Sequence, residues 1–563
     1  MASIDPTAAT ERFFLGASAA GLRRVLICPG SRSAPLAIGA ARSSGIPFAV
    51  HLDERTAAFA ALGEAKASGE PVAVICTSGT AGANFAPAIA EASMSNVPLI
   101  AVTADRPPEH QHWGVGQSLD QRGLFAPHVR TEYTMPVGGD AGSGFYERAG
   151  WRAAATAIEA GGPVHVNWAF RLPLEPVGAD TSPVTALPRT TRTLPRDEQE
   201  LDRFADALRS AQAPVLIAGP STVHPNEPDR ASSILQSADQ LNIAVLADVL
   251  SGLRGHGPQV SMPSYAGRTP GPADLIIRFG HTPTAKSTRL WWETCTDAGH
   301  VLLDPHNDWQ DPSHLLTDRL TSDPEWLLSR TAELLAAPTA ARRHVSDWHE
   351  RGQRVEHAIG TLLDGYSAFT EAHIARTVGR WAGEVPGRVV VSSSSMPVRD
   401  LDDFSPVTTS APMLANRGVN GIDGVIATAI GVSRAVDSRV TVLVGDIAAL
   451  HDIGSVLDAA RQAIPLTIVI PNNDGGGIFS NLPVRDAIEP AMFDQLFHTP
   501  HGTDFSFLDG VENASYTAVS SADALHAELQ PPSDVAVAVV EARVDTGERM
   551  SLRDDIHQAL LAL

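Results

Sequence analysis

Short apolar segments alternate with polar or glycine-containing turns and alanine-rich helical segments along much of this chain. The N-terminal third contains four such segments, at residues 25–35, 48–69, 72–92 and 98–109. Strands that alternate with helices pair in parallel, because each helix returns the chain to the same end of the sheet. The alternation therefore predicts an α/β fold built on parallel sheets.

Two polar residues in the C-terminal third, Asp446 and Asn473, each follow an apolar, β-branched run that is typical of a buried strand. Open α/β sheets bind their ligands at the carboxyl ends of such strands. Asp446 offers a carboxylate, Asn473 a side-chain carbonyl, and residues 474–477 free backbone carbonyls. These are hard oxygen donors of the kind that Mg²⁺ binds together with a diphosphate. Taken alone, the pair is explained equally well by a strand end followed by a glycine turn.

Glu54 lies where the apolar run FAVHLD ends and a helical segment begins. A single carboxylate at this place is usually a helix-start residue that the helix dipole favours. A catalytic carboxylate is the alternative. The position alone does not decide between the two interpretations.

The chain length and the segments that resemble linkers indicate several domains. A chain of 563 residues is long enough for three or four cores. Residues 177–200 are rich in proline and threonine and predict a linker, and a polar helical stretch at 340–363 leads into the last domain. The turn at residues 218–220 is not a Gly-x-Gly-x-x-Gly fingerprint, so nothing specific indicates FAD or NAD. No repeat of 20–50 residues is evident.

Composition excludes several functional classes. The net charge of −22 and the lack of a basic run argue against nucleic-acid binding. No apolar stretch approaches membrane-spanning length, and no secretory signal pattern opens the sequence. Three cysteines without metal-ligand spacing cannot form a disulfide framework, so we expect a reducing, cytoplasmic location.

Together these segments resemble the thiamine-diphosphate enzyme superfamily, and within it the 2-succinyl-5-enolpyruvyl-6-hydroxy-3-cyclohexene-1-carboxylate synthases of menaquinone biosynthesis. The superfamily's metal motif usually begins Gly-Asp-Gly, but Ile447 replaces its second glycine here. Ile447, His451 and Asp452 are instead similar to the variant of these synthases, which disfavours a generic pyruvate decarboxylase. The motifs that carry the resemblance are CPGSRSAPL, HLDER, TSGTA, ADRPPE, GQSLDQ, SMPVRDLD, NRGVNGIDG, GDIAALHD and NNDGGGIF.

The resemblance implies three doubly wound parallel-sheet α/β domains. They would be a pyrimidine-binding domain (residues 1–182), a central domain (183–350) and a diphosphate-binding domain (351–563). The cofactors would be thiamine diphosphate and Mg²⁺ or Mn²⁺. In this superfamily the two halves of the cofactor site come from different subunits, so a homodimer or homotetramer is expected.

The resemblance also assigns the cofactor contacts. Glu54 would be catalytic, sharing a proton with N1′ of the aminopyrimidine to favour its imino form. Ile422 would wedge between the two rings of the bent cofactor, although it is also explained as a core residue at a helix start. Asp446, Asn473 and the carbonyl of Gly475 would hold the metal. The remaining expected cofactor contacts are Thr77, Ser78, Gly79, Thr80, Ser395 and Ile447.

The synthases decarboxylate 2-oxoglutarate and add the resulting carbanion to isochorismate in a Stetter-like 1,4-addition. Both substrates are dianions, and arginines bind carboxylates best because their planar fork matches them. For any single arginine, a surface ion pair is the commoner explanation. By resemblance, Arg399 and Arg417 would hold the acid derived from 2-oxoglutarate. The residues expected to face isochorismate are Arg32, Arg106 and Gln117, and Ser31 is a further expected substrate contact.

Two further groups complete the expected substrate site. Ile478, Phe479 and Leu482 would form an apolar wall that excludes water. Lys286 is a weaker candidate, since an exposed lysine explains it as well. The basic residue expected after it is absent, because Ser287 stands there and Arg289 would have to substitute. The alternatives that remain open are another thiamine-diphosphate-dependent 2-oxo-acid lyase or synthase, and a non-catalytic protein on the same fold.

Overall fold

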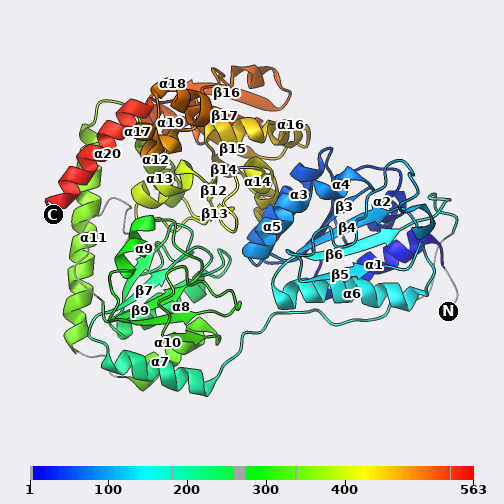
Figure 1. Ribbon diagram of the computed structural model, residues 1–563, viewed down its shortest axis with the longest axis horizontal. Coiled ribbons are helices and arrows are strands. Elements are labelled where there is room, and N and C mark those ends of the chain that lie inside the picture. Colours follow the sequence, from blue (N-terminus) through cyan, green and yellow to red (C-terminus); the bar gives the residue numbers. More distant parts are fainter. Residues whose placement is uncertain (1–3, 179–182, 259–272, 336–338, 533) are drawn as a thin grey trace. The chain divides into compact units, whose positions relative to one another are not determined.

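The structure is a computed structural model that describes residues 4–178, 183–258, 273–335, 339–532 and 534–563 (Figure 1). The chain forms two compact units. Unit 1 comprises Met1–Thr193, Asn416–Ser438 and His451–Pro465, and unit 2 comprises Leu194–Ala415, Arg439–Leu450 and Leu466–Leu563.

Unit 1 contains a six-stranded, all-parallel sheet in the order β2-β1-β3-β4-β6-β5. The strand order reverses between β1 and β3, so the turns after these two strands border a crevice where open sheets bind ligands. The strands are β1 (Arg24–Ile27), β2 (Phe48–Val50), β3 (Val72–Cys76), β4 (Leu99–Asp105), β5 (Thr131–Thr134) and β6 (Val164–Ala169).

Helices cover both faces of this sheet (Figure 1). Two of them, α1 and α6, cross closely because Gly16 and Gly150 have no side chains. A Cβ at either glycine would lie 1.8 Å from a backbone oxygen of the other helix. The helices from the N-terminal third are α1 (Pro6–Ala20), α2 (Ala34–Arg42), α3 (Glu54–Ser68), α4 (Thr80–Ala83), α5 (Ala86–Met94), the 3₁₀ turn η1 (Pro108–His110) and α6 (Ser143–Ala160).

Unit 1 also includes α14 (Val425–Val436) and α16 (Ile453–Arg461) from the C-terminal third. Helix α14 packs tightly on α3, because Gly63 and Gly431 leave no room for side chains. A Cβ at either glycine would lie 1.9 Å from a backbone oxygen of the opposite helix. The buried His51 side chain joins α16 through a 2.6 Å contact between its Nδ1 and Asp458 Oδ2.

Unit 2 contains two further all-parallel sheets. The first has the order β11-β10-β9-β7-β8. Its strands are β7 (Pro214–Ala218), β8 (Ala244–Ala247), β9 (Leu275–Phe279), β10 (Gly299–Leu303) and β11 (Asp318–Leu320). The helices along this part of the chain are α7 (Glu198–Ser210), α8 (Pro228–Gln240), α9 (Lys286–Trp292), α10 (Pro324–Leu334) and α11 (Thr339–Gly365).

The second sheet of unit 2 has the order β13-β12-β14-β15-β17-β16. Its strands are β12 (Val389–Ser392), β13 (Met413–Ala415), β14 (Val440–Leu443), β15 (Leu466–Asn472), β16 (Ala514–Val519) and β17 (Val537–Arg543). The remaining elements are α12 (Glu371–Glu384), α13 (Met396–Phe404), α15 (Asp446–His451), η2 (Gly477–Asn481), α17 (Val484–Ala487), α18 (Pro490–Phe493), η3 (Asp494–His498), η4 (Ser506–Gly510), α19 (Ala522–Glu528) and α20 (Thr546–Leu561).

These sheets confirm the predicted α/β fold with three parallel sheets. The polar helix expected at residues 340–363 is α11, and the boundary expected at residues 350/351 falls inside it. In the predicted linker, residues 177–178 and 183–197 contain neither helix nor strand, whereas residues 198–200 already belong to α7. The division into three domains remains a prediction. No helix in the described ranges is long and apolar enough to cross a membrane.

Candidate active site

In unit 1, the turns after β1 and β3 touch each other. A Cβ on Gly30 would lie 2.3 Å from the Thr77 side chain, so only glycine permits this approach. Gln117 is bound to the same region. Its Nε2 donates to the Ser78 carbonyl at 3.2 Å, and its own carbonyl accepts from Ser78 Oγ at 3.0 Å. The structure therefore brings together three of the predicted motifs, CPGSRSAPL, TSGTA and GQSLDQ.

Two arginines at this edge of the sheet have no carboxylate partner among the described residues. Arg32 is buried and donates from NH1 to the Phe170 carbonyl at 2.8 Å, and Arg106 donates to the Gly116 carbonyl at 2.9 Å. Among the described residues, neither forms an ion pair, and the Nε of each is buried without a hydrogen-bond partner. Burial lowers the pKa of Arg32, and the positive charge of Arg106 lowers it further. Two neighbouring, uncompensated cations favour an anionic ligand, because burying an unpaired charge is costly.

Glu54 is the first residue of α3, and it does not cap that helix. The capping role belongs to Asp53, whose carboxylate accepts from the backbone N–H groups of Arg55 and Thr56. Within the described part of the chain, no hydrogen bond or ion pair of the half-buried Glu54 carboxylate is found. Burial is the main cause of the raised pKa of the Cys28 and Cys76 thiols, and the negative charge of Glu54 raises both further. Glu54 is therefore available to a ligand near the ends of β1 and β3.

The motifs did not identify Gln121, which is fully buried and supports the turn at Gly79. Its Oε1 accepts from the Gly79 N–H at 3.2 Å, and its Nε2 donates to the Ala104 carbonyl and to Asn167 Oδ1. Gly79 adopts a φ of 86°, which a residue with a side chain rarely tolerates. The sequence did contain a signal, because Gln121 is the second glutamine of GQSLDQ.

The loop that carries Arg417 and Ile422 also belongs to unit 1. Buried Glu91 holds it by accepting from the backbone N–H groups of residues 418 and 419 at 3.0 and 2.9 Å. Ile422 is half-buried and precedes α14, so it is not a core residue at the helix start. A Cβ on Gly424 would lie 2.0 Å from the Phe59 ring, so the loop rests directly on the helix that begins with Glu54.

In unit 2, Asp446 begins α15 and is almost fully buried. Its Oδ2 accepts from the backbone N–H groups of Asn473 at 3.2 Å and Gly475 at 2.9 Å, so the turn after β15 folds around this carboxylate. Half-buried Ile447 donates its backbone N–H to Asp446 Oδ1 at 2.7 Å. His501, which the motifs did not include, lies 3.2 Å from Oδ2 through Nε2.

These residues fit a divalent cation. Among the described residues, Asn473 Oδ1 is buried and accepts no hydrogen bond. Gly475 has a φ of 145°, and a Cβ there would lie 2.2 Å from the His498 carbonyl oxygen. A carboxylate, an unpaired amide oxygen and a backbone carbonyl form an all-oxygen donor set that suits Mg²⁺ or Mn²⁺. The described residues contain no group of three His, Cys, Asp or Glu side chains suited to a metal. The donor set proposed here includes only one such side chain, that of Asp446.

Arg399 and Ser395 lie at the start of α13 in unit 2. Ser395 has a φ of 74°, and its carbonyl accepts a hydrogen bond from Arg399 NH1. Burial lowers the pKa of Arg399. In the part of the chain that the structure describes, Arg399 forms no ion pair with a carboxylate, so its charge is available to an acid.

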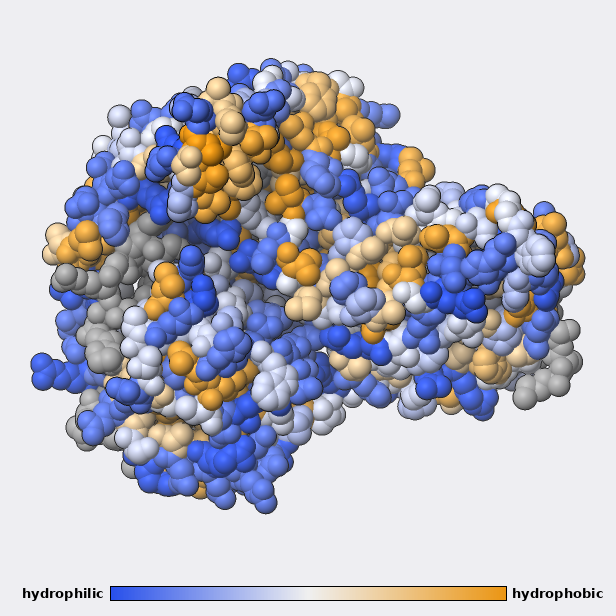
Figure 2. Space-filling view, in the orientation of Figure 1, coloured by the Kyte–Doolittle hydropathy of each residue, from blue (hydrophilic) through white to orange (hydrophobic). Residues whose placement is uncertain are grey.

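The predicted apolar wall follows the metal turn. Ile478 and Phe479 lie in η2, and the Phe479 ring packs 5.7 Å from that of Phe497. Leu482 is 46% exposed. Figure 2 shows hydrophobic residues at the surface over the neighbouring helices α17 and α18.

Lys286 and Arg289 lie on α9 in unit 2. Lys286 is exposed, and Arg289 forms an ion pair at 2.7 Å with Glu293, the C-cap residue of the same helix. The Ser287 hydroxyl is buried and has no hydrogen-bond partner among the described residues. The ion pair accounts for Arg289 without a substrate.

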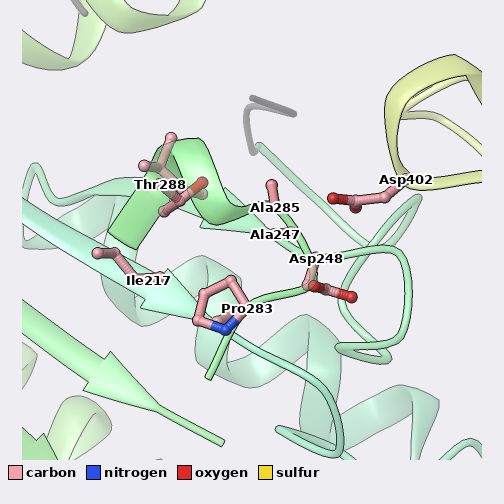
Figure 3. Close-up of a pocket in the computed structure, with 9 residues that line it drawn as sticks. Ile217, Ala247, Asp248, Pro283, Ala285, Thr288 and Asp402 are labelled. Carbon is pink, nitrogen blue, oxygen red and sulfur yellow. The ribbon is translucent and has the colours of Figure 1, made fainter. Parts of the chain in front are cut away.

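A separate small pocket lies at the ends of β7 and β8 (Figure 3). Burial raises the pKa of Asp402 well above its usual range, and the negative charge of Asp248 raises it further. Both carboxylates already have protein partners. Asp248 accepts backbone hydrogen bonds at 2.7 and 2.8 Å, and Asp402 pairs with Arg254 at 2.6 Å. The pocket contains none of the predicted site residues, and its lining residues are Ile217, Ala218, Leu246, Ala247, Asp248, Pro283, Ala285, Thr288 and Asp402.

Comparison with known proteins agrees with this geometry. The family model described as "Thiamine pyrophosphate enzyme, N-terminal TPP binding domain" matches residues 9–124, and the corresponding C-terminal TPP binding domain matches residues 404–549. These ranges include Glu54, Asp446 and Asn473.

Three similar proteins are each named 2-succinyl-5-enolpyruvyl-6-hydroxy-3-cyclohexene-1-carboxylate synthase. That of Chloroflexus aurantiacus is 35% identical over 93% of this chain and 91% of its own length. That of Listeria monocytogenes is 34% identical over 96% and 95%, and that of Haloquadratum walsbyi is 32% identical over 97% and 96%. With matches over nearly its whole length, the chain belongs to the 2-succinyl-5-enolpyruvyl-6-hydroxy-3-cyclohexene-1-carboxylate synthase family of thiamine-pyrophosphate-dependent enzymes.

Proposed function

We propose that this protein decarboxylates 2-oxoglutarate and adds the remaining four-carbon unit to isochorismate, releasing CO₂, in menaquinone biosynthesis. The observation that carries the proposal is the pair of uncompensated cations, Arg32 and Arg106, beside the turn at Ser78–Gly79. Isochorismate is a dianion, and two guanidinium groups match its charge. The product in the names of the similar proteins supports the same reaction.

Thiamine diphosphate, when bound, would supply the nucleophilic carbon for chemistry on a 2-oxo acid. Glu54 would share a proton with the aminopyrimidine of that cofactor, and Ile422 would pack against its rings. Asp446, Asn473 and the Gly475 carbonyl would hold Mg²⁺ or Mn²⁺, which would supply positive charge for the diphosphate. The remaining cofactor contacts are Thr77, Ser78, Gly79, Thr80, Ser395 and Ile447.

The substrate contacts follow the charges. Arg399 and Arg417 bind the carboxylate of the 2-oxoglutarate-derived unit, and Ser31, Arg32, Arg106 and Gln117 bind isochorismate. Ile478, Phe479 and Leu482 exclude water from the reacting atoms. Lys286 remains a candidate contact, while Arg289 is the weakest because Glu293 already neutralises it.

The direct test is reconstitution with 2-oxoglutarate, isochorismate, thiamine diphosphate and Mg²⁺, following isochorismate loss and CO₂ release. Omission of any one component should stop isochorismate loss. CO₂ release from another 2-oxo acid, with isochorismate unchanged, would instead support the second candidate, a thiamine-diphosphate enzyme with a different substrate pair.

We further propose a cytoplasmic homodimer or homotetramer in which the two halves of each site come from different chains. A mixture of Glu54→Gln and Asp446→Ala chains tests this arrangement. If the halves are exchanged, random dimers should regain about a quarter of the wild-type activity, because half are mixed and each mixed dimer has one intact site. Mixed dimers without recovered activity would show that each site is built from a single chain.

A further inference from the structure

The side-chain amide of Asn473 is held by a carboxylate outside the motifs. Glu371, the first residue of α12, is only 4% exposed. Its Oε1 accepts a hydrogen bond from Asn473 Nδ2 at 3.0 Å. The start of α12 does not need this side chain, because Thr370 and His373 form the capping box.

Arg549 of α20 keeps this carboxylate compensated. Its NH1 lies 3.5 Å from Glu371 Oε1, and its NH2 donates to Asp400 Oδ1 at 3.0 Å. Arg549 therefore lies between the Glu371 and Asp400 carboxylates, and Glu371 Oε1 is the oxygen that accepts the hydrogen bond from Asn473.

This chemistry determines which way the Asn473 amide faces. Of the two amide atoms only the nitrogen can donate, so Nδ2 faces Glu371 Oε1 and Oδ1 faces away from it. Asn473 Oδ1 is also the buried atom without a hydrogen-bond partner among the described residues. The backbone N–H of the same residue donates to Asp446 at 3.2 Å, so Asn473 adjoins the proposed metal carboxylate.

We propose that Glu371 is a positioning residue that orients Asn473 so that its amide oxygen faces the divalent cation. The inference rests on the proposed metal site and deepens it. A carboxylate that orients a metal ligand through its far side typically accounts for a 10–100-fold difference in metal affinity.

The test is Mn²⁺ binding to the full-length protein with saturating thiamine diphosphate, with free Mn²⁺ counted by electron paramagnetic resonance. Glu371→Gln should weaken Mn²⁺ binding by about 10–100-fold, because a glutamine can donate to Asn473 Oδ1 and turn the amide around. The matched control is Glu384→Gln at the other end of α12, where the side chain is exposed and pairs with Arg388 and His526. That variant should bind Mn²⁺ as the wild type does.

Exchanging the hydrogen-bond donor and acceptor between residues 371 and 473 distinguishes a change in amide orientation from a loss of folding. In the double variant Glu371→Gln/Asn473→Asp, the new amide can donate to the new carboxylate, whose second oxygen remains for the metal. Mn²⁺ affinity should return to within about threefold of wild type, well inside the loss expected for Glu371→Gln alone. No recovery, or an unchanged Mn²⁺ affinity in a folded Glu371→Gln variant, would overturn the proposal. Neither substrate is present, so a wrong assignment of the substrates would leave this result unaffected.

Discussion

Two of the sheets in this chain have the same strand order and carry different chemistry. The order β2-β1-β3-β4-β6-β5 in unit 1 corresponds strand for strand to β13-β12-β14-β15-β17-β16 in unit 2. The turn after β3 leads through the neutral residues 77–79 into α4, whereas the turn after β14 leads into α15, which begins with Asp446. The turn after β2 leads to Glu54, whereas the segment after β13 contains Ile422.

The comparison indicates that the strand order determines where a ligand would bind and that the side chains determine which ligand would bind. In both sheets the strand order reverses between the first and third strands, so topology puts the ligand-binding turns at equivalent positions. The side chains on those turns then select the ligand. A carboxylate without a protein partner suits a protonated ring nitrogen, and oxygen donors suit a divalent cation.

The largest expected effect is in the second sheet. Asp446→Ala should weaken Mg²⁺-dependent thiamine diphosphate binding by more than about 100-fold, which is the upper range for groups that only support a ligand. Isothermal titration calorimetry with and without Mg²⁺ measures it. Asp486→Ala, which changes an exposed aspartate on α17, is the control. Undiminished binding by the Asp446 variant would remove the metal assignment.

Substitution of Glu54 in the first sheet should leave the binding of the cofactor intact. Glu54→Gln should still bind the cofactor and Mg²⁺, yet turnover should fall by about 10²–10⁴-fold, the range for loss of a proton-transfer group. Steady-state kinetics beside calorimetry separates the two effects. Glu159→Gln, at an exposed site on α6, should change neither. Full activity of the Glu54 variant would contradict the catalytic assignment.

An arginine near each of the two sheets should affect the binding of a different substrate. Arg106→Ala should raise the apparent KM for isochorismate by about 10–100-fold, and Arg399→Ala that for 2-oxoglutarate, because each removes a charge-assisted hydrogen bond. Cofactor affinity should stay near wild type. The exposed pair of Arg209 with Asp206 offers a control in Arg209→Ala. Equal effects of both variants on both substrates would contradict this division.

The smallest expected effect concerns stability in acid. Burial lowers the pKa of His51 below its usual 6.5. Arg434 can only donate to Nε2, at 2.8 Å, so the neutral ring donates from Nδ1 to Asp458. As the pH falls below 6.5, the unfolded chain therefore binds a proton before the folded chain does, and stability decreases.

His51→Gln should flatten this decrease, as measured by the melting temperature between pH 7.5 and the His51 pKa. The exposed His557 provides the control, His557→Gln. An acid decrease as steep in the His51 variant as in the wild type would show that other groups cause it.

Sequence reasoning proposed site residues that local position marks. Glu54, Asp446 and Asn473 each stand at the end of a strand or the start of a helix, and hydrophobic periodicity marks such ends. It did not find Glu371 or Gln121, because their roles depend on contacts far along the chain. Glu371 meets Asn473 across 102 residues, and Gln121 supports Gly79 across 42.

The amino-acid sequence by itself determined the strand–turn–helix alternation, the oxygen donors after two strands and the motifs of the family. Those features depend on the spacing of residues close together in the chain, which can be read directly from the sequence. The tertiary structure decided the shared strand order of two sheets, the proximity of the Arg32 and Arg106 charges, and the Glu371 carboxylate that accepts a hydrogen bond from the Asn473 amide. Burial and hydrogen-bond direction exist only after distant segments pack together, because only then is each polar group's choice of partner restricted to its neighbours.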